Sequence, residues 1–96
     1  MTRRRVVITG IGAVTPVGRG REGLLAAMRE GRSGIGPITR FDASGFASRI
    51  AGEVRDFDPL AWMDARRARR LDRFAQFAVA AARQAAISFV QAYARA

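Results

Sequence analysis

The chain has 96 residues, of which 49% are hydrophobic, and it contains no cysteine and no histidine. Its 17 basic residues, all of them arginine, outnumber 8 acidic residues and give a formal net charge of +9 at pH 7. The missing cysteines exclude disulfides and thiolate metal sites, and the missing histidines remove the commonest metal ligand and general base. We therefore expect one small domain with no metal site and no cofactor, whose charge attracts an acidic partner.

A basic start followed by an apolar run, at residues 3–5 and 6–14, looks at first like a signal peptide. Gly10, Gly12 and Pro16 interrupt the run, and no cleavage site of small residues follows it. No segment reaches the roughly 20 apolar residues that span a bilayer. The sequence therefore predicts a cytoplasmic protein that does not enter a membrane.

The first third of the chain is predicted to form a strand, a loop and a helix. Residues 5–9 are a β-branched run without alternation, which is typical of a strand buried on both faces in a parallel sheet. Residues 10–18 form a glycine-rich turn. Leucines and a methionine at helical spacing predict a helix over residues 21–30, and Gly31 is placed to end it.

The middle of the chain has weaker signals. Residues 33–48 are rich in glycine, serine and proline and are predicted to be irregular. Residues 49–54 predict a second, short strand. Asp58 and Pro59 together favour the start of a helix, because aspartate caps free amides and proline suits the first turn. We expect a short helical turn carrying Trp62 to follow.

The strongest helix signal runs from Asp64 or Ala65 to about Ala86. A period of about 100° per residue places six apolar residues on one face: Leu71, Phe74, Ala75, Ala78, Val79 and Ala82. The opposite side of the first half carries four arginines within an arc of about 100°: Arg66, Arg69, Arg70 and Arg73. Farther along, Phe77 and Ala81 continue the arginine face as apolar surface. A helix that is apolar all round needs neighbours on every side, which indicates that this chain is part of something larger.

The spacing Gly10-x-Gly12 after a predicted strand is also found in dinucleotide-binding loops, where glycines let a pyrophosphate approach a helix. Here the third glycine of that pattern is replaced by Thr15, and the predicted helix begins several residues too late to present its amides. We therefore favour a structural turn over nucleotide binding.

The arginine cluster at residues 66–73 has two interpretations. One is an ordinary solvated helix face, partly neutralised by two aspartates. The other is a docking site for phosphates or carboxylates, with which guanidinium groups make bidentate contacts. Nucleic acid is disfavoured as a partner, because base stacking requires aromatic residues among the arginines, and Trp62, Phe74 and Phe77 are expected in the core.

Residues 4–18, with the sequence Arg-Arg-Val-Val-Ile-Thr-Gly-Ile-Gly-Ala-Val-Thr-Pro-Val-Gly, resemble the N-terminal signature of the β-ketoacyl-acyl-carrier-protein synthases, particularly the type II fatty-acid elongation enzymes. Five further segments resemble the family in the same order and at the expected spacing: 33–35, 41–44, 49–54, 57–59 and 69–74. The resemblance covers residues 3 to about 85. The ketosynthases of type II polyketide systems share the opening, so that function stays open as an alternative.

The resemblance implies an α/β fold of the thiolase-like kind, with α-β-α-β-α layers, in enzymes that usually form homodimers. It also implies a decarboxylating Claisen condensation, in which a cysteine holds the acyl group and two histidines assist. In the family these three residues lie beyond position 96. No catalytic residue is therefore assigned here, and we expect residues 1–96 to be a partial N-terminal domain that is inactive by itself.

One role transfers by position. The family's docking patch for acyl-carrier protein includes basic residues that match Arg66, Arg69 and Arg70 of this sequence. A small basic module that only binds carrier protein is thus a second alternative. Residues 87–96 diverge from the family, which usually continues with an acidic residue and a turn of small residues and glycine. A frameshift, a gene-prediction error or a genuine truncation would each explain this tail.

Overall fold

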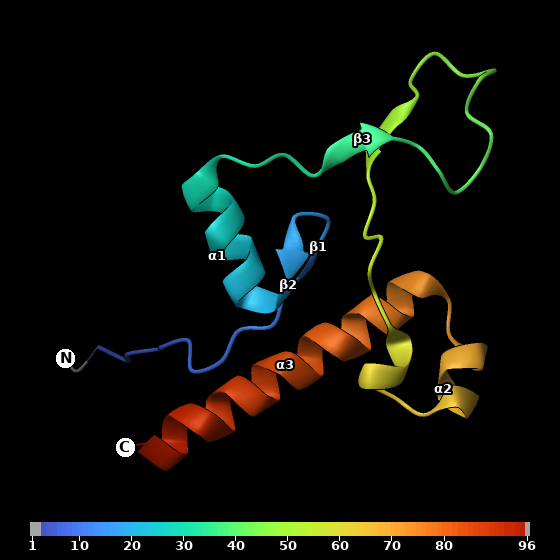
Figure 1. Ribbon diagram of the computed structural model, residues 1–96. Coiled ribbons are helices and arrows are strands. Elements are labelled where there is room, and N and C mark those ends of the chain that lie inside the picture. The colour runs from blue at the N-terminus through green and yellow to red at the C-terminus, as the bar shows by residue number, and fades with distance from the viewer. Residues whose placement is uncertain (1–2, 96) are drawn as a thin grey trace. The chain divides into compact units, whose positions relative to one another are not determined.

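The computed structural model describes residues 3–95, with the side chains of residues 3–94. The chain divides into two compact units, one made of Ala13–Asp58 and the other of Met1–Gly12 together with Pro59–Ala96. Figure 1 shows the short strands and the α-helices of the described residues. None of the helices within residues 3–95 combines the length and hydropathy that crossing a bilayer requires.

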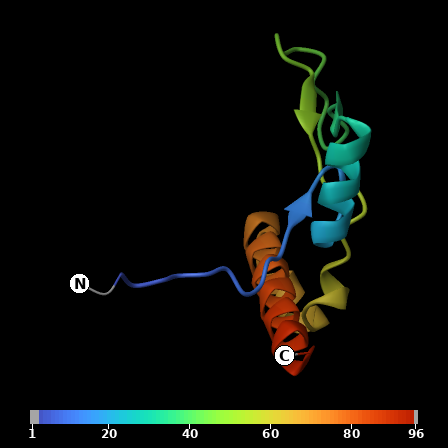
Figure 2. The same ribbon diagram turned by 90° about the vertical axis from the view of Figure 1, so that its left-hand side faces the viewer.

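The unit Ala13–Asp58 begins with an antiparallel hairpin of strands β1 (Val14–Thr15) and β2 (Gly18–Arg19), which leads directly into helix α1 (Gly20–Glu30). Figure 2 shows the hairpin beside this helix. Glycines at both contact points allow the approach, because a Cβ on Gly18 would lie 2.8 Å from the Cα of Gly23. The helix predicted over residues 21–30 is confirmed. It ends at Gly31, whose φ of 64° is left-handed.

Strands β3 (Ile35–Pro37) and β4 (Ile50–Gly52) form a second antiparallel hairpin in the same unit. The prediction of a strand over residues 49–54 is confirmed in its central part. The prediction that residues 33–48 are irregular is wrong at Ile35–Pro37, which form β3. Proline and glycine in this segment are typical of turns, so the sequence pattern does not indicate a strand. The hydrogen bonds of β3 come from pairing with β4.

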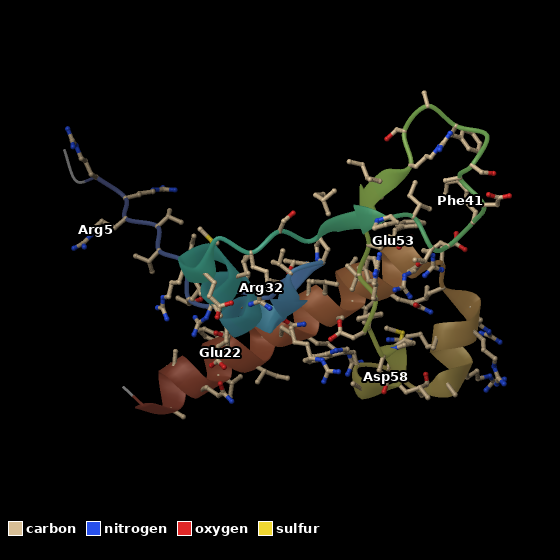
Figure 3. All side chains as sticks on the ribbon, turned by 45° about the horizontal axis from the view of Figure 1, so that its top comes forward. Arg5, Glu22, Arg32, Phe41, Glu53 and Asp58 are labelled. Carbon is tan, nitrogen blue, oxygen red and sulfur yellow. The ribbon has the colours of Figure 1, made fainter. Side chains whose placement is uncertain are left out.

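The carboxylate of Glu53 holds the long loop of this second hairpin. It accepts hydrogen bonds from the Thr39 hydroxyl at 2.8 Å, the Thr39 amide at 3.1 Å and the Arg40 amide at 3.2 Å. Figure 3 shows Glu53 at the foot of this loop. Hydrogen bonding, with the Thr39 side chain the largest cause, lowers the pKa of Glu53, because these donors favour the charged carboxylate.

The prediction of a buried strand over residues 5–9 is wrong. Neither sheet among the described residues includes this segment, and its Val6 and Ile8 side chains are 93% and 81% exposed. A strand that is buried on both faces requires neighbouring strands and covering helices. Residues 3–95 supply no strand that pairs with it, so the apolar pattern is present without the sheet that would bury it.

In the other unit, Gly10 and Gly12 lie directly against helix α3 (Arg73–Arg95). A Cβ on Gly10 would overlap the carbonyl oxygen of Ala85, and a Cβ on Gly12 would overlap that of Ala81. Both positions therefore require glycine for packing against the helix backbone. This close contact gives the two glycines a structural role, in agreement with the preference for a structural turn.

The continuous helix predicted from residue 64 or 65 to about 86 is instead two helices. The helical turn η1 (Pro59–Ala61) precedes α2 (Ala65–Arg70), and α3 begins at Arg73 after an extended Leu71. The expected turn after Asp58 and Pro59 is thus present, but it ends at Ala61, one residue before Trp62. Helical periodicity continues across the break, which is why the sequence pattern did not reveal it. Helix α3 also runs past the predicted end, to Arg95.

The face of α3 that lies inside the unit differs from the predicted one. Ala80 is fully buried, whereas Phe74, expected in the core, is 75% exposed. Residues 10–12 pack against the positions around Ala81 and Ala85 and so select that side of the helix. Much of the predicted apolar face is consequently open in this structure.

Candidate functional site

The unit that contains α2 has an open hollow of about 790 Å³. Its apolar lining comes from η1, the segment that follows it, and the residue after α2: Leu60, Ala61, Trp62, Met63 and Leu71. Its charged lining consists of one carboxylate and four guanidinium groups: Asp64, Arg66, Arg67, Arg70 and Arg83. The hollow therefore combines an apolar floor with an excess of positive charge.

Local sequence features hold α2 beside this floor. The side chain of Asp64 accepts a hydrogen bond of 3.1 Å from the Arg67 amide, which caps the start of the helix. Ala68 is buried and faces the rest of the unit. The arginines of α2 are exposed, and Figure 3 shows nitrogen-tipped side chains extending from this helix.

The three arginines expected to dock a carrier protein all lie on α2 and are exposed. Arg66 and Arg70 line the hollow, whereas Arg69 is outside its lining. Arg73, predicted on the same helix face, lies beyond the helix break, and its guanidinium is 5.0 Å from the centre of the Phe77 ring. The placement of Arg73 in one continuous arginine face is therefore wrong.

Two arginines of the hollow, Arg67 and Arg83, were not predicted from the sequence pattern. In a continuous helix, Arg66 and Arg83 would lie about 25 Å apart along the axis. After Arg70 the chain changes direction, so that α2 and α3 are not one continuous helix (Figure 1). The side chains of Arg66 and Arg83 both line one hollow. No periodic pattern in the sequence contains this relationship.

The guanidinium groups of the hollow are available to a partner. None of the ion pairs found among residues 3–94 involves Arg66, Arg67, Arg70 or Arg83. Guanidinium groups form paired hydrogen bonds with carboxylates and phosphates. The arrangement is thus suited to binding an acidic partner. It contains no thiol or imidazole for nucleophilic catalysis.

Comparison with known proteins identifies the family. The sequence profile described as the N-terminal domain of β-ketoacyl synthase matches residues 3–88. This chain belongs to the β-ketoacyl synthase family. The resemblance seen in the sequence is therefore confirmed over nearly the whole chain.

Several members of the β-ketoacyl synthase family are similar to this chain over most of its length. The 3-oxoacyl-[acyl-carrier-protein] synthase 2 proteins of Synechocystis sp. and Coxiella burnetii are 52% and 53% identical over 88% of the chain. A granaticin polyketide putative beta-ketoacyl synthase 1 of Streptomyces violaceoruber is 51% identical over 85%. The chain covers 20% of each of these relatives, about a fifth of their length.

A solved structure confirms the fold. The ishigamide ketosynthase/chain length factor superposes with a TM-score of 0.83 and 46% sequence identity, over 92% of this chain and 22% of that one. The chain is therefore a fragment of the thiolase-like ketosynthase fold. The exposed apolar segment at residues 5–9 agrees with a fragment, because residues 3–95 supply no strand that pairs with it.

Proposed function

We propose that this chain is the N-terminal part of a cytoplasmic 3-oxoacyl-[acyl-carrier-protein] synthase that is homodimeric when complete. Such an enzyme elongates fatty acyl chains by decarboxylating Claisen condensation of acyl and malonyl-carrier protein. The observation that supports this function is the similarity to relatives of that name, at 52% and 53% identity over 88% of this chain.

The 96-residue chain does not catalyse this condensation by itself. The sequence contains no cysteine to hold the acyl group and no histidine to assist decarboxylation. We expect no β-ketoacyl product when the purified chain is incubated with acyl- and malonyl-carrier protein. Product above the level of a protein-free control would refute this proposal.

The part of the function that this chain carries is docking of the acidic carrier protein through Arg66, Arg69 and Arg70. Their exposure on α2 and the excess of guanidinium groups around the hollow support this assignment. Exposed charges of this kind mainly raise the encounter rate and fix orientation. If the chain acts alone in the cell, it acts as a small binding module for carrier protein.

Titration of labelled holo-acyl-carrier protein tests the docking proposal. The variant Arg66→Glu, Arg70→Glu reverses two charges on α2, and we expect it to bind at least about tenfold more weakly. The matched control is Arg21→Glu, Arg29→Glu, which makes the same change on the exposed surface of α1. Equal affinity of the two variants would reject the docking role.

A type II polyketide ketosynthase is the second candidate function. It is supported by the 51% identity to the granaticin protein and by the match to the ishigamide ketosynthase/chain length factor. Parallel titrations with carrier proteins from a fatty-acid system and from a polyketide system distinguish the two functions. Tighter binding of the polyketide carrier protein would favour the second candidate.

A further inference from the structure

The hollow beside α2 is lined by apolar residues as well as by arginines. Docking by charge alone would not require the apolar residues. Met63 is 6% exposed and Leu60 is 59% exposed, and both form part of the apolar lining. Arginines from α2 and α3 surround this lining. A partner that contacts both the apolar lining and the arginines must be amphipathic. It needs an apolar side chain to pack on the apolar lining and carboxylates to pair with the arginines.

Charge complementarity identifies the kind of partner. Four arginines and one aspartate line the hollow, so an acidic surface is attracted to it. A small free anion would leave the apolar lining unused. An acidic helix that presents one apolar side chain fits both features, and helix-in-groove recognition is a common mode of peptide binding.

We propose that the hollow binds an apolar side chain on an acidic helix of the carrier protein, and that Arg67 and Arg83 are further specificity-determining residues for docking. This inference rests on the proposed function. It differs from the docking patch expected from the sequence, because it adds Arg83 from a second helix. It also assigns Arg69, which lies outside the lining, a smaller part than Arg67.

The experiment measures the affinity of the 96-residue chain for holo-acyl-carrier protein at low and at physiological salt. Two variants test the charges. Arg67→Gln, Arg83→Gln removes both added arginines, and the control Arg21→Gln, Arg29→Gln removes the same charge from α1. We expect about a fivefold or greater loss of affinity for the first, corresponding to about 0.5 kcal/mol per ion pair, and less than about twofold for the control. Circular dichroism verifies that both variants keep the helix content of the parent chain.

A second pair of variants tests the apolar floor without changing charge. Leu60→Gln removes an exposed apolar side chain from the hollow, and Leu25→Gln makes the same change on α1. We expect Leu60→Gln to weaken binding about threefold at both salt concentrations, because the lost contact is apolar. Binding by Leu60→Gln at the affinity of the parent chain would overturn the apolar seat.

The outcomes separate this inference from the docking proposal. If Arg66→Glu, Arg70→Glu weakens binding but Arg67→Gln, Arg83→Gln does not, the carrier protein does not bind in the hollow. The proposed docking through Arg66, Arg69 and Arg70 is then retained. If neither double variant weakens binding, both proposals fail. If a DNA duplex binds more tightly than carrier protein and loses affinity with Arg67→Gln, Arg83→Gln, the hollow serves nucleic acid and the inference is overturned.

Discussion

The side-chain amide of Gln76 donates a hydrogen bond of 2.8 Å to the backbone carbonyl of Ala68, across the break between α2 and α3. A second, longer contact of 3.4 Å reaches the carbonyl of Leu71. Helix ends leave carbonyl groups without helical partners, and Gln76 supplies a donor at the point where α2 stops. One side chain thus links the arginine-bearing helix α2 to the helix that carries Arg83.

Replacing Gln76 is expected to loosen this junction. Gln76→Ala removes both hydrogen bonds, and we expect it to lower the free energy of unfolding by about 1–2 kcal/mol. Urea unfolding followed by circular dichroism measures the change. The control Gln91→Ala alters an exposed glutamine of the same helix and should change stability by less than about 0.5 kcal/mol. Equal effects of the two variants would contradict the assigned role of Gln76.

The close approach of the N-terminal segment to α3 predicts a strong dependence on Gly12. In Gly12→Ala the new Cβ would overlap the Ala81 carbonyl oxygen and lie 2.9 Å from the Cβ of Gln84. We expect a loss of about 1–3 kcal/mol in the free energy of unfolding. Gly45→Ala is the matched control, because nothing lies within 4 Å of its added methyl group. A stability change in Gly12→Ala no larger than in the control would show that the segment does not pack there.

The end of α1 predicts a conformational effect without a steric one. Gly31 has a φ of 64°, and no atom lies within 4 Å of a Cβ built there. Gly31→Ala should therefore lower stability by about 1 kcal/mol through the left-handed backbone alone. Gly31→Asn should be less harmful, because asparagine tolerates this conformation. Thermal unfolding of both variants gives the comparison, and a more stable alanine variant would contradict the prediction.

The Glu53 hydrogen bonds predict a pH dependence of stability. The pKa of Glu53 is lowered from its ordinary value of 4.5 in the folded chain. Its contribution is therefore fully present above pH 4.5 and is lost as the pH falls through the lowered folded pKa. The difference in unfolding free energy between the parent chain and Glu53→Gln should be largest near neutral pH and shrink below pH 4.5.

Removing the donor tests the cause of that shift. In Thr39→Val the hydroxyl is absent, and we expect the pKa of Glu53 to rise toward its ordinary value, because the Thr39 side chain is its largest cause. Carboxyl chemical shifts followed by NMR through the acid range report this pKa directly. An unchanged titration of Glu53 would show that the hydroxyl does not act as described.

Asp64 caps the start of α2 and also places a carboxylate in the lining of the hollow. One substitution separates these two roles. Asp64→Ser keeps a residue that caps a helix, but it removes the carboxylate from the hollow. Stability should change by less than about 0.5 kcal/mol, whereas carrier protein should bind about two- to threefold more tightly at low salt. Asp64→Ala, which also lacks the cap, should lower stability by about 1 kcal/mol. Weaker binding by the serine variant would contradict the expectation that the Asp64 carboxylate repels the acidic carrier protein.

The sequence predicted correctly those features that depend only on residues close together in the chain. The helix over residues 21–30 depends on its own apolar spacing and on a glycine at its end, and the structure confirms both. The helical turn after Pro59 likewise follows from local chemistry. The family resemblance over residues 3 to about 85 agrees with the matched range 3–88.

The predictions that the structure contradicts depend instead on how segments pack together. The strand predicted at residues 5–9 requires partners that residues 3–95 do not supply, and an apolar pattern cannot indicate whether a sheet is present. The helix break at residues 71–72 preserves the helical period on both sides, so no periodic signal marks it. The break also removed Arg73 from the predicted arginine face and brought Arg83 to the hollow.

By itself, the sequence determined the family, the excess of positive charge, the absence of a catalytic thiol and imidazole, and the local helix boundaries at Gly31 and Asp64. Only the tertiary structure decided which arginines share a surface and which side of α3 is buried. The physical reason is that capping, glycine conformation and charge act over a few neighbouring residues. The contact between α2 and α3 instead involves a hydrogen bond from Gln76 to the carbonyl of Ala68, eight positions away along the chain.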